Sequence, residues 1–351
     1  MDNKIIRVLI VDDSALMRNI IGKILDSDPH IEIAGKAMNG NFALQKIPKL
    51  NPDIIILDLE MPEMNGIAFL KERKKRGIKT PVVILSSVAK KGAQITMEAL
   101  SLGASDFIMK PSGEESDTIS RVGRNLIATV KAYGSHIARN MPSQSRTVPQ
   151  AETAVKTRKS PVDIIVIGVS TGGPNALREI FANLDPNLPL PILVVQHMPA
   201  GFTEEFAKSL NKISPLEVKE AKDGDLCKPG RILIAPGDFH LEVERKELAV
   251  ATRLSSSPPV NGHRPSVDVL FASAAAVFSD KILAVIMTGM GRDGAREIGT
   301  IYRKGGITLG QDENSCVVYG MPKAAYENGF LHEVVPLHEM AGAINRIGLR
   351  R

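Results

Sequence analysis

Tryptophan is absent from the 351-residue sequence, and aromatic residues make up only 4% of it. This scarcity disfavours a stacking surface for single-stranded nucleic acid. The two cysteines, Cys227 and Cys316, lie far apart without histidines at metal-ligand spacing, which argues against a disulfide framework or zinc site and fits a reducing compartment. The sequence has no apolar run of the roughly 20 residues that a membrane span needs, and no signal-peptide pattern. We therefore expect a cytoplasmic protein without membrane insertion.

The residues that are present are those of a folded protein with more than one core. Hydrophobic residues account for 43% of the chain and charged residues for 24%, and 351 residues favour two domains. The net charge is +5, but much of the basic excess lies in residues 71–79 and 139–159. A solvated helix face and a linker explain these stretches better than a nucleic-acid footprint, so no nucleic-acid partner is expected.

Two regions alternate short β-type runs with helical patterns. The runs of the first region, residues 1–133, are 7–11, 32–37, 54–57, 82–85 and 106–109, and helical patterns follow them. Residues 134–160 lose this rhythm and are rich in proline, serine and glutamine, as in a flexible linker. In residues 161–351 the runs are 164–167, 192–195, 231–234, 282–287 and 306–309. Both regions are predicted to be doubly wound α/β domains, the second mostly parallel, with a hairpin in 237–252 that adds antiparallel strands at a sheet edge.

Polar residues follow the predicted strands of the first region, where parallel α/β sheets form their sites. They are Asp12 and Asp13, Asp58, Ser86, and Lys110. Crowded carboxylates need a compensating cation, and oxygen ligands suit Mg²⁺. Asp58 could then attack a phosphoryl donor while Lys110 neutralises the developing charge. Each residue alone would more often be a helix N-cap, but the whole set at strand ends favours a site.

This region resembles the response-regulator receiver domains of two-component signalling. The matching segments are Val11-Asp-Asp-Ser14, Leu57-Asp-Leu-Glu-Met-Pro62 with Gly66, Ser86-Ser87 and Lys110-Pro111. The resemblance implies a flavodoxin-like (βα)5 fold with Asp58 as phosphoacceptor and a histidine kinase as phosphodonor. It implies Mg²⁺ bound by Asp13, Asp58 and the Glu60 carbonyl, with Asp12 acting mainly through water. Ser86 and Phe107 occupy the positions of the family's switch pair, although Phe107 could simply be a core residue.

In the second region, Ser170 stands in the segment Gly168-Val-Ser-Thr-Gly172, directly after an apolar run and before a helical pattern. This is the spacing of a nucleophile elbow, in which a sharp strand-to-helix turn exposes a hydroxyl. A glycine-rich turn that binds phosphate, or nothing, gives the same local pattern. The choice therefore depends on whether the chain supplies a base for the serine.

Of the seven histidines, only His197 directly follows a buried-strand pattern, at 192–196. It comes 27 positions after Ser170, a distance that suits an elbow, a helix and a return strand. Adjacent strands lie about 5 Å apart, so the two side chains can meet. Asp293 follows the strand pattern at 282–287 and could orient the imidazole. Asp238 and Asp268 are rivals, although turn and helix-start preferences explain both.

The order serine, histidine, aspartate excludes the α/β-hydrolase fold, in which the acid precedes the histidine. Oxyanion donors are expected from the backbone at Thr171 and from the loop 289–291. Met290 would line the pocket, although a packing role explains it equally well.

Residues 163 to about 345 resemble the catalytic domain of the CheB family of chemotaxis protein-glutamate methylesterases. The matching segments are Gly168–Pro174, Val195–Pro199, Asn261–Asp268, Met287–Gly294, Gln311–Glu313 and Gly320–Pro322. The resemblance implies hydrolysis of γ-glutamyl methyl esters on methyl-accepting chemoreceptors and deamidation of receptor glutamines, by Ser170, His197 and Asp293. No cofactor is expected for the esterase reaction, and phosphorylation of Asp58 is expected to activate it.

Two other functions fit parts of the sequence. A phosphorylation-dependent binding module could hold a dinucleotide in the glycine loops at 168–173 and 289–294. The chain lacks G-x-G-x-x-G spacing, however, and His197 stands where that motif requires an acidic residue. A DNA-binding response regulator is disfavoured because the second region is α/β and not a small helical reader.

Overall fold

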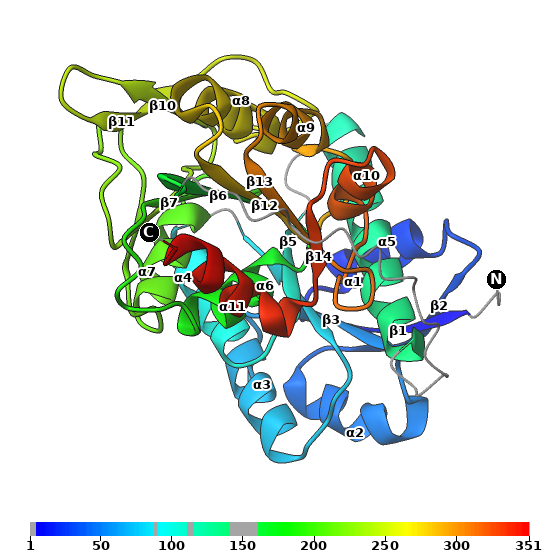
Figure 1. Ribbon diagram of the computed structural model, residues 1–351. Helices are drawn as coiled ribbons and strands as arrows, with labels where there is room; N and C mark the ends of the chain where they lie inside the picture. Colours follow the sequence, from blue (N-terminus) through cyan, green and yellow to red (C-terminus); the bar gives the residue numbers. More distant parts are fainter. Residues whose placement is uncertain (1–4, 88–89, 111–115, 140–160, 351) are drawn as a thin grey trace. The chain divides into compact units, whose positions relative to one another are not determined.

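The computed structural model describes residues 5–87, 90–110, 116–139 and 161–350 (Figure 1). The chain forms two compact units, Met1–Thr147 and Val148–Arg351. Helix α5 (Ser116–Arg139) includes the first six residues of the segment predicted as a linker. The rest of that segment, like Pro111 of the receiver motif, lies outside the described residues.

The first unit is a five-stranded parallel sheet in the order β2-β1-β3-β4-β5. Its strands are β1 (Ile6–Val11), β2 (Ile31–Ala37), β3 (Ile54–Asp58), β4 (Val82–Ser86) and β5 (Asp106–Met109). The helices are α1 (Ala15–Leu25), α2 (Gly40–Leu50), α3 (Gly66–Lys75), α4 (Lys90–Ser101) and α5. Helices α1 and α5 pack on one face and α2, α3 and α4 on the other. This is the predicted flavodoxin-like arrangement, which is confirmed.

Apolar runs and N-caps explain these elements. Strands β3 and β4 are buried along their whole length, as expected of central parallel strands covered on both faces. Ser14, Asn39 and Asn65 cap α1, α2 and α3 by accepting a hydrogen bond from a first-turn N–H. The polar residues before the caps are therefore held at the carboxyl ends of the strands.

The second unit has a seven-stranded parallel sheet in the order β14-β13-β12-β6-β7-β9-β8. The strands are β6 (Ile164–Val169), β7 (Ile192–Gln196), β8 (Glu217–Glu220), β9 (Arg231–Ile234), β12 (Ile282–Ile286), β13 (Ile307–Gln311) and β14 (Glu333–Val335). The helices are α6 (Gly173–Ala182), α7 (Phe202–Asn211), α8 (Val267–Phe278), α9 (Ala295–Arg303), α10 (Met321–Glu327) and α11 (Leu337–Gly348). The predicted doubly wound α/β class is confirmed.

The predicted hairpin forms, as β10 (His240–Arg245) and β11 (Val250–Ser255), but it does not extend the large sheet. It makes a separate two-stranded sheet beside α8 (Figure 1). Leu241 and Val243 on its buried face pack into the core with Leu270 and Phe271 of α8. The hairpin buries its apolar face on a helix, so it has no need of a strand partner in the sheet.

The order of strands β12, β6 and β7 decides where a site can form. Strand β6 lies between β7, which follows it in the chain, and β12, which comes more than a hundred residues later. Such a reversal of strand order opens a crevice at the carboxyl ends of the strands. Ser170, His197 and Asp293 follow β6, β7 and β12, respectively.

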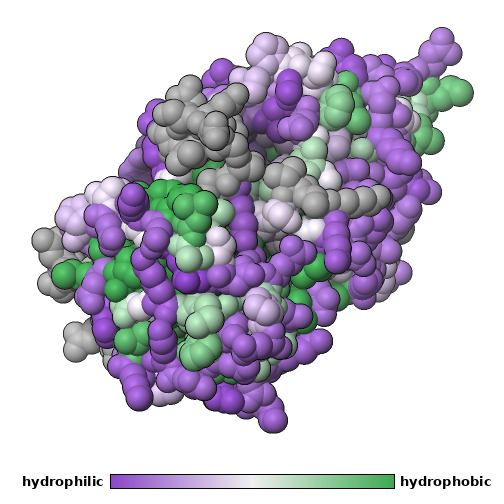
Figure 2. All heavy atoms as spheres, turned by 180° about the vertical axis from the view of Figure 1, so that it is seen from behind, coloured by the Kyte–Doolittle hydropathy of each residue, from purple (hydrophilic) through white to green (hydrophobic). Residues whose placement is uncertain are grey.

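Within the described residues, no helix combines the length and apolar character needed to cross a bilayer. Hydrophilic residues cover most of the face seen in Figure 2, and hydrophobic residues appear there in smaller groups.

Candidate functional site

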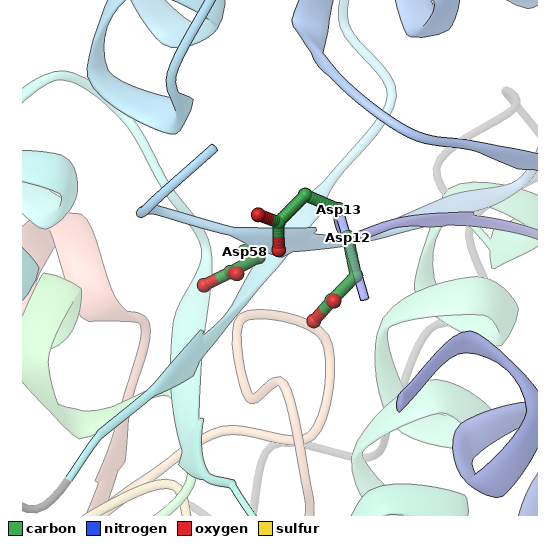
Figure 3. Close-up of side chains that lie close together, drawn as sticks. All are labelled: Asp12, Asp13 and Asp58. Atoms are coloured by element: carbon green, nitrogen blue, oxygen red, sulfur yellow. The ribbon is translucent and has the colours of Figure 1, made fainter. Parts of the chain in front are cut away.

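The carboxylates predicted to bind a cation lie together in the first unit. Asp12 and Asp13 follow β1, and Asp58 ends the neighbouring strand β3. One ligand oxygen from each lies within 4.8 Å of the others (Figure 3). Asp12 and Asp58 are buried, whereas Asp13 is exposed. A cavity of ≈ 590 Å³ lined by Asp13 and Glu60, among others, opens beside them.

Lys110 holds the buried pair. Its Nζ lies 2.7 Å from Asp58 Oδ2 and 3.2 Å from Asp12 Oδ2. Burial, reinforced by the charge of Asp12, raises the pKa of Asp58, although Lys110 partly offsets this effect. Burial alone would lower the pKa of Lys110, but its hydrogen bond to Asp58 and the charges of the two aspartates raise it. Asp12 Oδ2 nevertheless accepts no well-directed hydrogen bond from any described residue, so it fits a role as acceptor toward a hydrated cation.

The predicted switch residues lie on the adjacent strands β4 and β5. Ser86 is buried, and its Oγ lies 2.7 Å from Oγ1 of Thr96 in α4. Phe107 is half-buried on β5, where it pairs with Ile84. The sequence analysis did not identify Thr96 as a partner of Ser86. The signal that could have found it is a threonine on the face of a predicted helix that packs against the sheet. The Ser86 hydroxyl is thus engaged with α4 in this structure.

In the second unit, Ser170 stands on a turn held from both sides. Its N–H donates to the Thr288 carbonyl at 3.0 Å, and its carbonyl accepts from the Gly173 N–H at 2.8 Å. Gly172 has φ +80°, a left-handed conformation that glycine adopts without strain. The side chain is half-buried at the start of α6. These features are those of the predicted elbow.

His197 occupies the equivalent place on the next strand. Val169 pairs with Gln196, so Ser170 and His197 are the next residues on adjacent parallel strands. The His197 Nε2 lies 2.8 Å from Asp293 Oδ2. Its Nδ1 is buried and has no hydrogen-bond partner among the described residues. With Nε2 donating to the carboxylate, Nδ1 is left as the basic nitrogen.

Asp293 is buried against the N-terminus of α8 and accepts five hydrogen bonds. The donors are His197 Nε2, Val267 N, Asp268 N, Ser266 Oγ and Asn261 Nδ2, at 2.7–3.2 Å. Burial alone would raise the pKa of Asp293, but the bonds from His197, Asn261 and Val267 outweigh it and lower that pKa well below its ordinary value. The carboxylate is therefore charged and fixed in place.

The rival aspartates have other roles. Asp238 is exposed in a turn with φ +66°. Asp268 is buried and linked to Asp293 through Asn261, whose Nδ2 donates to both carboxylates at 2.8 Å. The sequence analysis did not single out Asn261 as part of the site. Its left-handed φ of +55° was not apparent from the sequence.

The loop 289–291, from which oxyanion donors were predicted, has only part of its N–H groups available. The Gly289 N–H donates to the Val318 carbonyl at 3.0 Å, so the expectation that it is free is wrong. A Cβ at Gly289 would lie 2.8 Å from the Ser170 Cβ, so this position brings the loop close to the serine. No described residue accepts a hydrogen bond from the N–H of Thr171 or Met290. The Met290 side chain is 40% exposed and is therefore not a packed core residue.

His263 lies in the same loop as Asn261, before α8, and the sequence analysis did not single it out either. Its ring stacks on that of His197 with centroids 3.8 Å apart and planes 5° from parallel. Burial, and secondarily the neighbouring His197, lower the pKa of His263 to about 4. At neutral pH the His263 ring is therefore uncharged and covers one face of the His197 ring by stacking on it.

We expect His263 to make the second unit sensitive to acid. Between pH 6.5 and 4 the unfolded chain binds a proton at this position and the folded chain does not, so the free energy of unfolding falls as the pH falls, by about 2 kcal/mol between pH 7 and 5. His263→Gln should reduce the loss of Tm between pH 7 and 5, measured by calorimetry on the full chain. His338→Gln, at an exposed histidine, should leave it unchanged. Equal losses in all three proteins would contradict the shift.

Comparison with known proteins gives one consistent result for both units. Residues 165–344 match the CheB methylesterase family model, and residues 8–121 match the response regulator receiver domain. A protein-glutamate methylesterase/protein-glutamine glutaminase of Treponema denticola is 56% identical, with 98% of each chain covered. One of Treponema pallidum is 49% identical, with 98% of this chain and 97% of the relative covered. The CheB methylesterase catalytic domain of Thermotoga maritima superposes with a TM-score of 0.52 at 43% identity, covering 53% of this chain and 99% of that one.

Proposed function

The chain belongs to the CheB family of protein-glutamate methylesterase/protein-glutamine glutaminases, and we propose that it is a phosphorylation-activated serine esterase of chemotaxis adaptation. Its substrates are glutamyl methyl esters and glutamines of methyl-accepting chemoreceptors. The observation that carries the proposal is the Nδ1 of His197, which is buried and has no hydrogen-bond partner among the described residues, while Nε2 is bonded to Asp293. His197 and Ser170 directly follow paired residues of adjacent strands.

In the proposed reaction, Ser170 is the nucleophile and His197 the general base. As Oγ attacks the ester carbonyl carbon, its proton passes to His197 Nδ1, and the imidazolium is stabilised by Asp293. Collapse of the tetrahedral intermediate breaks the bond to the methoxy oxygen, which leaves as methanol with that proton. Water, deprotonated by Nδ1, then attacks the glutamyl-serine ester, and the bond to Ser170 Oγ breaks as the proton on Nδ1 passes to that oxygen, which restores the free serine. A glutamine substrate follows the same course and releases ammonia.

The developing oxyanion needs donors that are already oriented. The N–H groups of Thr171 and Met290 have no acceptor among the described residues and flank the serine turn and the Gly289 loop. We assign them to this role. The exposed Met290 side chain lines the entrance for the substrate. None of these steps uses a group outside the chain other than water.

The receiver unit is proposed to control this reaction through Asp58. Asp58 accepts the phosphoryl group from a chemotaxis histidine kinase, with Lys110 neutralising the added charge. Asp13, Asp58 and the Glu60 carbonyl would hold Mg²⁺, with Asp12 acting through water. The ion supplies charge neutralisation at the phosphoryl oxygens when bound. Ser86 and Phe107 would report the phosphorylated state, which requires Ser86 to exchange its bond with Thr96.

Asp58→Asn tests this control. A small acyl phosphate with Mg²⁺ should raise methanol release from methylated receptor in the unmodified protein by about fivefold or more, a coupling of about 1 kcal/mol. The variant should keep its basal rate and show no increase, because an amide cannot form the acyl phosphate. Asp26→Asn removes an exposed carboxylate of the same unit and should be activated normally. A chelator that removes Mg²⁺ should abolish the increase caused by the acyl phosphate and leave the basal rate unchanged. Activation of Asp58→Asn would contradict the assignment.

A further inference from the structure

Gln196 connects the two residues that the proposed reaction brings together. It is the last residue of β7, directly before His197, and pairs across the sheet with Val169, directly before Ser170. The side chain is almost completely buried, with 2% of the residue exposed. Its Nε2 donates to the carbonyl of Ser170 and to that of His197, both at 3.1 Å. One amide group thus bridges the backbones that follow two neighbouring strands.

The orientation of this amide is determined by its surroundings. Rotating the group by half a turn would place Oε1 against two carbonyl oxygens and remove both hydrogen bonds. In the observed orientation Oε1 is buried and has no partner among the described residues. A Cβ at Gly173 would lie 2.0 Å from Oε1, so the glycine of the elbow leaves the space that the amide occupies. The serine turn and the glutamine therefore fit together as one unit.

A purely structural role explains this arrangement poorly. A buried acceptor without a partner is unfavourable, and an apolar side chain of similar volume would avoid it. The Ser170 carbonyl is already bonded to the Gly173 N–H at 2.8 Å, so the turn can form without the glutamine. The His197 N–H already donates to the Val169 carbonyl at 3.2 Å, one residue before the turn. The glutamine adds a second link, which reaches the carbonyl of Ser170 itself.

We propose that Gln196 is a positioning residue that fixes the separation of Ser170 and His197 by holding both backbone carbonyls on one amide. The inference rests on the proposed roles of those two residues. Proton transfer needs Ser170 Oγ and His197 Nδ1 within about 2.6–3.2 Å, and misplacement by about 1 Å can reduce the rate a hundredfold. His197 is also fixed by Asp293, so the glutamine sets where the serine turn lies relative to an imidazole that is already oriented.

Two substitutions in the full chain test the proposal. Gln196→Met keeps the volume and removes the donor, and we expect kcat for methanol release to fall about 30- to 100-fold while KM stays within about twofold. Labelling of Ser170 by a serine-directed phosphonate should slow by the same factor, because it needs the nucleophile and not the receptor. At pH 8 the kcat of Gln196→Glu should be reduced as much as that of Gln196→Met, because the carboxylate repels the two carbonyls. Its kcat relative to the unmodified protein should rise as the pH falls, because the protonated carboxyl can donate again.

Thr308→Val is the matched control. Thr308 is buried on β13 of the same sheet, and its Oγ1 donates to the Phe330 carbonyl at 2.7 Å. Loss of this hydrogen bond should lower Tm without changing kcat. The control therefore distinguishes an effect on stability from an effect on the positions of Ser170 and His197. The inference is overturned if Gln196→Met keeps its kcat and its labelling rate, or if the loss in Gln196→Glu is independent of pH. Ser170→Ala, measured in parallel, tests the proposed function itself: an active Ser170→Ala protein refutes that function whatever Gln196 does.

Discussion

Ser170→Ala is expected to lower kcat for methanol release from methylated receptor by about 10⁵-fold or more, the scale seen when a triad nucleophile is removed. Covalent attack requires the Ser170 Oγ, and Ser170 and His197 directly follow paired residues of adjacent strands. The hydroxyl of Thr171 on the same turn lies one residue further along and is not expected to replace it. The Ser170 Oγ makes no hydrogen bond to any described residue, so its removal should change the free energy of unfolding by less than about 0.5 kcal/mol. Activity should be lost from a protein with an unchanged Tm.

Two measurements separate this outcome from general damage. Ser256→Ala removes an exposed hydroxyl of the same unit and should retain full activity. A serine-directed phosphonate should label the unmodified protein on Ser170 and leave Ser170→Ala unlabelled. Methanol release by Ser170→Ala at even a hundredth of the normal rate would show that another group is the nucleophile.

The sequence predicted the large sheets well because parallel strands covered by helices on both faces are continuous apolar runs. The two edge strands of the second sheet gave no such signal. Strand β8 is Glu217–Glu220, half of it acidic, and β14 has only three residues, so neither run stood out. The hairpin was recognised from its alternation, but its partner, α8, begins a dozen residues after β11 ends. Which surface a hairpin covers depends on packing that a local pattern does not contain.

The same distinction holds within the site. Ser170, His197 and Asp293 were predictable because each follows a strand, and a parallel sheet brings its strand ends together. Asn261 and His263 lie in an irregular loop whose course depends on contacts with Asp293 and His197. Gln196 reads in sequence as the end of a buried strand. Its role becomes visible only when the carbonyls of Ser170 and His197 are seen on either side of its amide.

Asp293→Asn is the second substitution with a large expected effect, a loss of about 10³- to 10⁴-fold in kcat. All five groups that approach this carboxylate do so as donors, and an amide can accept at only one of its two ends. If the amide nitrogen faces His197, the ring must present an unprotonated Nε2, and its proton moves to Nδ1. That tautomer has no free nitrogen for the Ser170 proton. If the amide nitrogen instead takes the place of Oδ1, it faces the Asn261 Nδ2 and the Asp268 N–H, both of which are donors.

Either orientation leaves a buried donor without an acceptor, so Tm should also fall, by an amount corresponding to about 1–3 kcal/mol. Asp268→Asn distinguishes the two effects because Asp268 is buried equally deeply and shares Asn261 as a partner, yet makes no bond to His197. It should cost similar stability and less than about tenfold in kcat, since only the donor to Asp293 is disturbed. Equal losses of kcat in the two variants would mean that the aspartates act on the site only through its folding. A loss confined to Asp293→Asn ties the effect to the tautomer of His197, the feature on which the proposed proton transfer depends.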